Sequence, residues 1–290
     1  MPAPERRALA ALGLALLLWA VSFPATHIAL LAYPPEHLAL ARYSLATLVL
    51  LGYCVLTRAP LPRRADLPSL ALTGLLCGTA YQLGFNFGMR TVVSGPAGVL
   101  VDTVPIFFAL FGFFFLRERL GVWAVGGIAL GFIGTVLIAS GEADAAGFAL
   151  DPGTGYLLLA ALAFSLGSVV QKPLLSRLPA IPATAYYFVA ATLGLCGFAP
   201  GLGASVAAAP ASANWALLFL ALFPAALSFA LWSYALARLP VAEVASSLYL
   251  VPVLTFPIAW VWLGEVPSAL SFGGGAIALA GVLLVQLKGR

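Results

Sequence analysis

The stretch that decides the fold is residues 104–137, VPIFFALFGFFFLRERLGVWAVGGIALGFIGTVL, which returns 147 residues later as residues 251–284, VPVLTFPIAWVWLGEVPSALSFGGGAIALAGVLL. Each copy holds a Val-Pro apolar run, a Glu, and then a glycine-rich apolar run. A shift of 145 residues also places Pro34 on Pro179. The positions that agree at the shift of 147 are Val104, Pro105, Leu116, Glu118, Gly126, Gly127, Ala129, Gly134 and Leu137. The chain is therefore predicted to hold two copies of one structural unit.

The composition of the whole chain indicates that lipid is its solvent. Of 290 residues, 62% are hydrophobic and 8% are charged, whereas soluble domains have about 25% charged residues. Crossing a hydrocarbon core takes about 20 apolar residues in a helix. The apolar runs are continuous, not alternating, which excludes a β-barrel. Ten spans are predicted, over residues 8–31, 36–56, 67–89, 96–116, 121–140, 153–175, 181–202, 213–237, 242–263 and 268–287.

The basic residues provide an independent test of these spans. With the N-terminus in the cytoplasm, twelve of the fourteen Lys and Arg residues fall on cytoplasmic ends and loops, and only Arg42 and Arg90 do not. Cytoplasmic loops of membrane proteins carry such an excess of Lys and Arg. The twelve are Arg6, Arg7, Arg58, Arg63, Arg64, Arg117, Arg119, Lys172, Arg177, Arg238, Lys288 and Arg290. The prediction is a multi-pass protein of the cell inner membrane with both termini cytoplasmic.

Each half of the chain, residues 1–145 and 146–290, receives five predicted helices. Because five is odd, the second half enters the membrane from the opposite side. The predicted fold is an all-α membrane protein with ten transmembrane helices as two inverted five-helix repeats. Inverted repeats are typical of secondary transporters, with the substrate near the midplane between them. The alternative is a duplication that serves only a scaffold.

The chain resembles the EamA-type members of the drug/metabolite transporter superfamily over nearly its whole length. The resemblance implies a fold with helices one, three, four, six, eight and nine around a central cavity, and export of amino acids or other small metabolites. The two Glu motifs differ in their neighbours, so the copies are not chemically equivalent. The residues that carry the resemblance are Trp19, Ser22-Phe23-Pro24, Pro105 with Leu116-Arg117-Glu118, Pro252 with Leu263-Gly264-Glu265, and the glycine-rich fifth and tenth spans.

Polar and aromatic side chains within the spans are the candidates for binding substrate, because a small-molecule site combines aromatic walls with a few polar groups. Gln82 and Asn86 are four residues apart and share a helix face. The competing interpretation is that these polar side chains only bond neighbouring helices to each other. For His27 the alternatives are a packed hydrogen-bonding residue and a proton carrier or substrate contact. The candidate substrate-binding residues are His27, Tyr81, Gln82, Asn86, Asp102, Phe164, Ser168, Trp232 and Tyr249.

Three further pairs have predicted roles in gating or structure. Ionisable groups inside a span are costly and point to function, so Asp102 and Arg42 form either a structural ion pair or a gate and substrate contact. Pro105 and Pro252 lie deep in matching helices and kink them, either as hinges or as fixed bends. Glu118 and Glu265 each precede a helix start, where unpaired N–H groups favour a carboxylate, and are expected to be structural caps.

The favoured function is a secondary transporter that exports amino acids, aromatic or other neutral ones, by alternating access. The alternative is a multidrug or organic-cation exporter, which Asp102 keeps open; a nucleotide-sugar carrier would need more cavity Lys or Arg. An enzyme is not expected, because no metal-ligand cluster or nucleophile–base pair is present, and the lack of a P-loop excludes ATP hydrolysis. No cofactor, metal or nucleic-acid partner is predicted. The expected partners are a small-molecule substrate and the bilayer, with the chain either a monomer or a homodimer.

Overall fold

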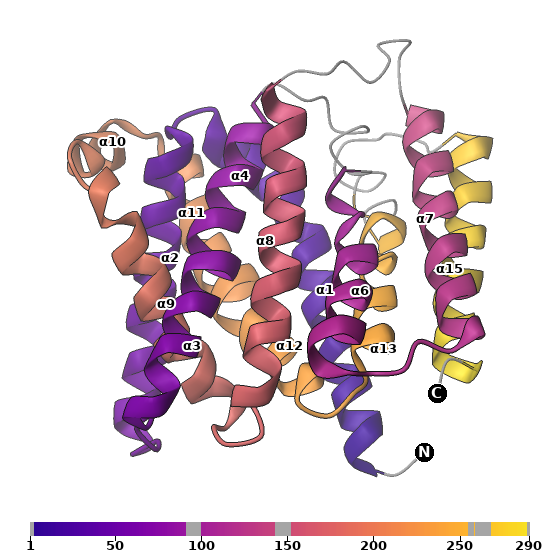
Figure 1. The fold of residues 1–290 in the computed structure, drawn as a ribbon. Helices are drawn as coiled ribbons and strands as arrows, with labels where there is room; N and C mark the ends of the chain where they lie inside the picture. The colour runs from indigo at the N-terminus through magenta and orange to yellow at the C-terminus, as the bar shows by residue number, and fades with distance from the viewer. Residues whose placement is uncertain (1–2, 91–99, 143–151, 255–257, 259–267, 289–290) are drawn as a thin grey trace. The chain divides into compact units, whose positions relative to one another are not determined.

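The computed structural model describes residues 3–90, 100–142, 152–254, 258 and 268–288, and its regular elements in these ranges are all helical (Figure 1). The chain divides into two compact units. Unit 1 comprises Met1–Asn86 and Val170–Arg238, and unit 2 comprises Phe87–Val169 and Leu239–Arg290. Each unit therefore takes residues from both halves of the sequence.

Unit 1 is built around α2, which packs against α9, and α1, which packs against α11 and α12. The hydroxyls of Thr47 on α2 and Thr192 on α9 lie 2.9 Å apart, and these residues coincide at the shift of 145. The elements are α1 (Ala3–Leu30), α2 (Pro35–Leu56), η1 (Arg64–Asp66), α3 (Leu67–Thr73), η2 (Gly74–Ala80), α4 (Tyr81–Gly88), α9 (Ala180–Leu195), η3 (Cys196–Phe198), α10 (Leu202–Ala208), α11 (Ala211–Leu220), η4 (Ala221–Leu227) and α12 (Ser228–Leu236).

Unit 2 is built around α7 and α15, which lie side by side along their length (Figure 1). Helix α13 packs on α6, α7 and α15. The elements are α6 (Val104–Leu116), α7 (Val122–Glu142), α13 (Val241–Ser247) and α15 (Ala269–Lys288), together with the greater part of α8 (Pro152–Leu174), whose last turn belongs to unit 1.

Within the described residues, seven helices are long and apolar enough to cross a membrane. Large apolar side chains such as Phe114 and Phe115 on α6 are exposed, which water would disfavour and hydrocarbon would not. The seven are Glu5–Leu30, Pro35–Leu56, Val122–Ser140, Pro152–Leu174, Ala180–Phe198, Ala211–Leu236 and Ala269–Lys288, with shorter apolar helices at Val104–Leu116 and Val241–Leu254.

Proline and glycine set the ends of several helices. Pro34, Pro179 and Pro240 stand immediately before α2, α9 and α13 with extended backbone, close to the predicted span starts at residues 36, 181 and 242. Proline has no N–H, and the first N–H groups of a helix have no partner inside it. The predicted seventh span was wrong at its end: α9 stops at Leu195, and Gly201 takes a left-handed φ of 85° before Leu202 opens α10.

The glycines of α7 and α15 bring two helix backbones into contact. A Cβ at Gly134 would lie 2.7 Å from the Gly274 carbonyl oxygen, and one at Gly127 would lie 2.7 Å from that of Gly281. The shift of 147 residues maps Gly127 onto Gly274 and Gly134 onto Gly281. Each contact is therefore the repeat-related copy of the other, and the packing has an internal two-fold relation. These close contacts between glycines are made within one chain.

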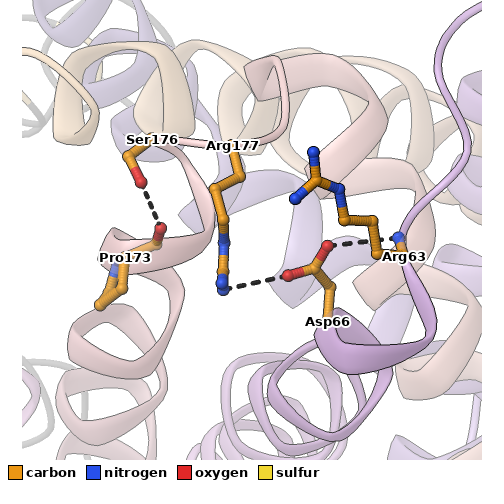
Figure 2. A network of polar contacts seen from close by, with 5 residues as sticks. All are labelled: Arg63, Asp66, Pro173, Ser176 and Arg177. Atoms are coloured by element: carbon orange, nitrogen blue, oxygen red, sulfur yellow. Dashed lines mark hydrogen bonds and ion pairs between the residues drawn. The ribbon is translucent and has the colours of Figure 1, made fainter.

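One buried carboxylate in unit 1 forms an ion pair (Figure 2). Asp66 Oδ1 lies 3.0 Å from a guanidinium nitrogen of Arg177, and Asp66 Oδ2 accepts the backbone N–H of Arg63 at 3.2 Å. The exposed fractions of the two side chains are 1% for Asp66 and 49% for Arg177. This pair joins the start of α3 to the turn that follows α8.

Asp66→Asn is expected to lower the free energy of unfolding by about 1–2 kcal/mol. This is less than the loss of a fully buried ion pair, because water at the half-exposed Arg177 weakens the attraction between the two charges. Thermal unfolding of the purified protein in detergent measures it. Arg119→Gln removes an exposed charge and serves as the control. Equal unfolding temperatures for Asp66→Asn and Arg119→Gln would contradict the assignment.

Candidate functional site

The polar side chains of α4 hold that helix against the start of α2. Gln82 Nε2 donates to Asn86 Oδ1 at 2.7 Å, and Asn86 Nδ2 donates to the carbonyl oxygen of Pro35 at 2.8 Å. Both side chains are buried. They share a face, as their spacing requires, and Tyr81 stacks on Phe85 with ring centroids 6.0 Å apart. The hydrogen bonds give Asn86 a structural contact, and its role toward substrate stays a prediction.

Arg42 on α2 places a buried positive charge in unit 1. Its side chain is 5% exposed, and Tyr43 and Tyr81 are its electrostatic neighbours. The Nε atom is buried without a hydrogen-bond partner among the described residues. A guanidinium in apolar surroundings is costly unless it meets an acceptor, so this nitrogen is suited to an anionic group. Asp102, its proposed partner, belongs to unit 2, and their pairing stays a prediction.

Unit 1 also contains an aromatic cluster that includes the predicted site residue Trp232. Trp19 lies 5.2 Å from Trp232 and 5.3 Å from Phe229 between ring centroids. Trp232 is buried on α12. Such a cluster provides flat apolar surface within a transmembrane unit.

The π-helical segments η2 and η4 occupy corresponding places in the two halves, since the shift of 147 maps Gly74–Ala80 onto Ala221–Leu227. In η2 the carbonyl of Cys77 accepts the Tyr43 hydroxyl at 3.3 Å. In η4 the carbonyl of Pro224 accepts Trp19 Nε1 at 3.0 Å. Cys77 and Pro224 coincide at the same shift. A π-helical turn disturbs the regular ladder and is frequent at functional sites, and here each wide turn has an aromatic donor.

Tyr43→Phe and Trp19→Phe each remove one of these donors. We expect each to lower the free energy of unfolding by about 0.5–1.5 kcal/mol, since an ordinary hydrogen bond contributes that much. Tyr53→Phe on the exposed face of α2 is the control. Thermal unfolding in detergent measures the differences, and a loss no larger than that of Tyr53→Phe would refute the pairing.

In unit 2, Asp102 and Tyr249 lie at turns that interrupt two predicted spans. Helical residues 100–101 are followed by a turn at 102–103 and then α6, and α13 is followed by a turn at 248–249 and a helical turn at 250–254. Pro105 therefore stands in the first turn of α6, and its predicted place deep in a helix was wrong. The physical reason is that proline fits the first turn of a helix but not its interior. Pro252 lies in the helical turn at 250–254, and the hinge role of both prolines stays a prediction.

The face of α8 that carries Phe164, Ser165 and Ser168 is buried in unit 2. The Ser165 hydroxyl lies 2.7 Å from the Ala161 carbonyl oxygen and 3.1 Å from that of Val104. The predicted residues Phe164 and Ser168 thus lie on the helix face that contacts the start of α6.

Glu118 binds a helix start in the other half of the sequence. Its Oε2 accepts the backbone N–H of Val241, the first residue of α13, at 2.7 Å. The geometry is that of a cap, and the helix that it caps is α13, whose first residue lies 123 positions after Glu118. The reason is that Arg117 takes a left-handed φ of 56° and ends α6, which turns the chain after it. Glu265 lies outside the described residues.

His27 lies in the last turn of α1 on an exposed face. The structure thus brings Tyr81, Gln82, Asn86, Trp232 and Arg42 into unit 1, with His27 exposed on the same unit. It brings Asp102, Tyr249, Phe164 and Ser168 into unit 2. One contact that sequence reasoning missed is Gly131 on α7, where a Cβ would overlap the Tyr249 ring.

Comparisons with known proteins agree over most of the chain. The model of the EamA-like transporter family matches residues 6–140 and again residues 151–287. The chain is 38% identical to a probable terminal-alkyne amino-acid exporter of Streptantibioticus cattleyicolor, over 78% of this chain and 75% of the relative. It is 34% identical to the uncharacterised transporter YdfC of Bacillus subtilis, over 93% of this chain and 88% of the relative. A solved crystal structure shares the fold with a TM-score of 0.79 at 24% identity, over 98% of this chain and 97% of its own.

Proposed function

Because the chain belongs to the EamA-like transporter family, with one copy of the family pattern in each half, we propose that it exports neutral amino acids, aromatic ones among them. Membership of the family, together with the apolar helices, indicates a multi-pass membrane protein that transports small molecules rather than an enzyme. The observation that carries the proposal is the 38% identity to a relative named as a probable amino-acid exporter.

The side chains of each unit support an amino-acid substrate. Unit 1 holds a buried guanidinium at Arg42 and the aromatic surface of Trp19 and Trp232. A guanidinium matches a carboxylate in charge and geometry, and the aromatic rings match an apolar side chain. Unit 2 holds a buried carboxylate at Asp102, which matches an ammonium group. Each unit by itself therefore carries a group suited to one charge of a zwitterion.

The proposal for mechanism is alternating access by ten transmembrane helices in two inverted halves, residues 1–145 and 146–290, with both termini in the cytoplasm of a cell with an inner membrane. The exchanged glycine contacts of α7 and α15 support a two-fold relation between the halves. Inverted repeats allow inward-open and outward-open states of similar energy. Because those glycines are covered within the chain, a monomer is the proposed transporting form.

The experiment is counterflow in proteoliposomes. Vesicles that contain the full chain and millimolar unlabelled L-phenylalanine, L-leucine or L-threonine are diluted into the radiolabelled amino acid. We expect transient accumulation of label with at least one of them, and none in vesicles without protein. Absence of accumulation across all neutral amino acids would refute the substrate class.

The second candidate is an organic-cation exporter, and Asp102 favours it because a buried carboxylate suits a substrate with positive charge only. The same vesicles are tested with radiolabelled tetraphenylphosphonium. Counterflow of this cation without counterflow of any amino acid would replace the first proposal with the second.

A further inference from the structure

Two polar side chains of unit 2 are buried, and the described residues provide neither with a hydrogen-bond partner. The Asp102 side chain is 9% exposed and that of Tyr249 is 0% exposed. The Tyr249 hydroxyl has no hydrogen-bond partner among the described residues. Within the described part of unit 2, no hydrogen bond or ion pair includes the Asp102 carboxylate. Buried polar groups are nearly always satisfied, so each unsatisfied one calls for an explanation.

The two residues occupy the same place in the two copies of the repeat. The shift of 147 maps Asp102 onto Tyr249, and Pro105 onto Pro252 three residues later. Each residue lies in a turn between two helical segments. Thr103 N bonds the Leu100 carbonyl at 3.3 Å, and Tyr249 N bonds the Ser246 carbonyl at 3.1 Å, so both turns use the tighter spacing of three residues.

The packing of α6 on α13 brings the two turns close together. The apolar cluster that contains Tyr249 includes Ile106, in the first turn of α6, and Asp102 lies four residues before Ile106. The Tyr249 ring packs among apolar side chains of α6, α7, α13 and α15, and Gly131 leaves it room. One carboxylate and one phenol oxygen in low-dielectric surroundings form an environment that attracts positive charge.

We propose that Asp102 and Tyr249 together form a binding site for a small cation, either the ammonium group of a transported amino acid or a monovalent metal ion. The ammonium form deepens the amino-acid export proposed above and rests on it. The metal-ion form would make the site a coupling site. In both, the carboxylate supplies the charge and the phenol oxygen supplies a further acceptor.

Thermal unfolding of the full chain in detergent tests the site without any transported substrate. The probes are methylammonium, sodium and potassium chlorides, titrated at constant ionic strength against N-methylglucamine chloride. We expect one of the three to raise the unfolding temperature of the wild type with a saturable dependence. Asp102→Asn should weaken the apparent affinity about tenfold or more, and Tyr249→Phe by a smaller factor. Asp102→Glu should retain the response, and Tyr53→Phe is the matched control on an exposed tyrosine.

The outcomes separate the two sources and the two proposals. A response to methylammonium alone assigns the site to an ammonium group, and a response to sodium or potassium assigns it to a metal ion. Identical responses of wild type, Asp102→Asn and Tyr249→Phe to all three salts would overturn the site. Failure of amino-acid counterflow with an intact cation response refutes the proposed function only, and the reverse result refutes this site only.

Discussion

Gly274→Leu is expected to abolish most of the folded protein, whereas Gly273→Leu, one residue earlier, is expected to be nearly neutral. A Cβ at position 274 would lie 2.7 Å from both the Gly134 carbonyl oxygen and the Ile138 nitrogen. Both are backbone atoms of α7, which cannot move aside as a flexible side chain can. Overpacking by even a few methylene groups costs about 1–3 kcal/mol, so a whole leucine against backbone should cost at least about 3 kcal/mol.

The chain supplies matched controls at the neighbouring glycine of each helix, which faces away from the contact. A Cβ at Gly273 meets no atom within 4 Å, and one at Gly126 meets only a leucine methyl at 4.0 Å. Gly127→Leu should therefore behave like Gly274→Leu, and Gly126→Leu like Gly273→Leu. Yield of monodisperse protein and its unfolding temperature in detergent measure the effect. If all four variants behaved alike, the packing of α7 on α15 would be refuted.

Arg42→Gln is expected to weaken the apparent affinity for amino acids by about 10–100-fold. The guanidinium is buried and its Nε lacks a partner among the described residues of unit 1, and hydrogen bonds to charged groups contribute about 1.5–3 kcal/mol. Counterflow measured over a range of amino-acid concentrations yields the apparent KM. Arg42→Lys keeps the charge but not the planar fork and should lie between the wild type and Arg42→Gln.

The control for this prediction is Arg90→Gln, because Arg90 is exposed and belongs to the same predicted side of the membrane. Inhibition of counterflow by 2-phenylethylamine, which lacks a carboxylate, should be unchanged in Arg42→Gln. An amino-acid KM that is equal in the wild type and in both Arg42 variants would remove Arg42 from the substrate site.

The membrane environment, the repeat and several helix starts could be predicted from sequence. The apolar composition predicts a helical membrane protein, and the described elements are helical with seven helices of spanning length. The repeat and its motifs predict the family that the comparisons confirm. Pro34, Pro179 and Pro240 mark helix starts because their lack of an N–H is a local property.

Irregular backbone inside the predicted spans could not be predicted from sequence. The turns at residues 102–103 and 248–249 and the wide turns η2 and η4 lie within apolar runs that read as continuous helix. Hydropathy measures transfer to lipid and is insensitive to which carbonyl a given N–H bonds. Only Pro105, Pro224 and Pro252 signalled irregularity there, and a proline does not reveal whether the helix bends, widens or restarts.

The candidate site divides in the same way. Gln82 and Asn86 lie on one face because of their spacing, which the helix period determines. The partners of Trp19, Glu118 and Gly131 are distant in sequence, at Pro224, Val241 and Tyr249. No local pattern contains those pairings, although the shift of 147 could have suggested Asp102 and Tyr249 as counterparts.

The sequence by itself determined that this chain is a membrane protein, that it holds two copies of one structural unit, and which family it belongs to. Composition and repetition are properties of the linear chain. Only the tertiary structure decided which backbone carbonyls the π-helical turns present to aromatic donors, which helix Glu118 caps, and where unpaired polar groups remain. The reason is that these features depend on contacts between residues that are distant in sequence, 34 positions apart for Tyr43 and Cys77 and 205 for Trp19 and Pro224. Close packing, as at Gly127 and Gly134, fixes such contacts in the folded chain.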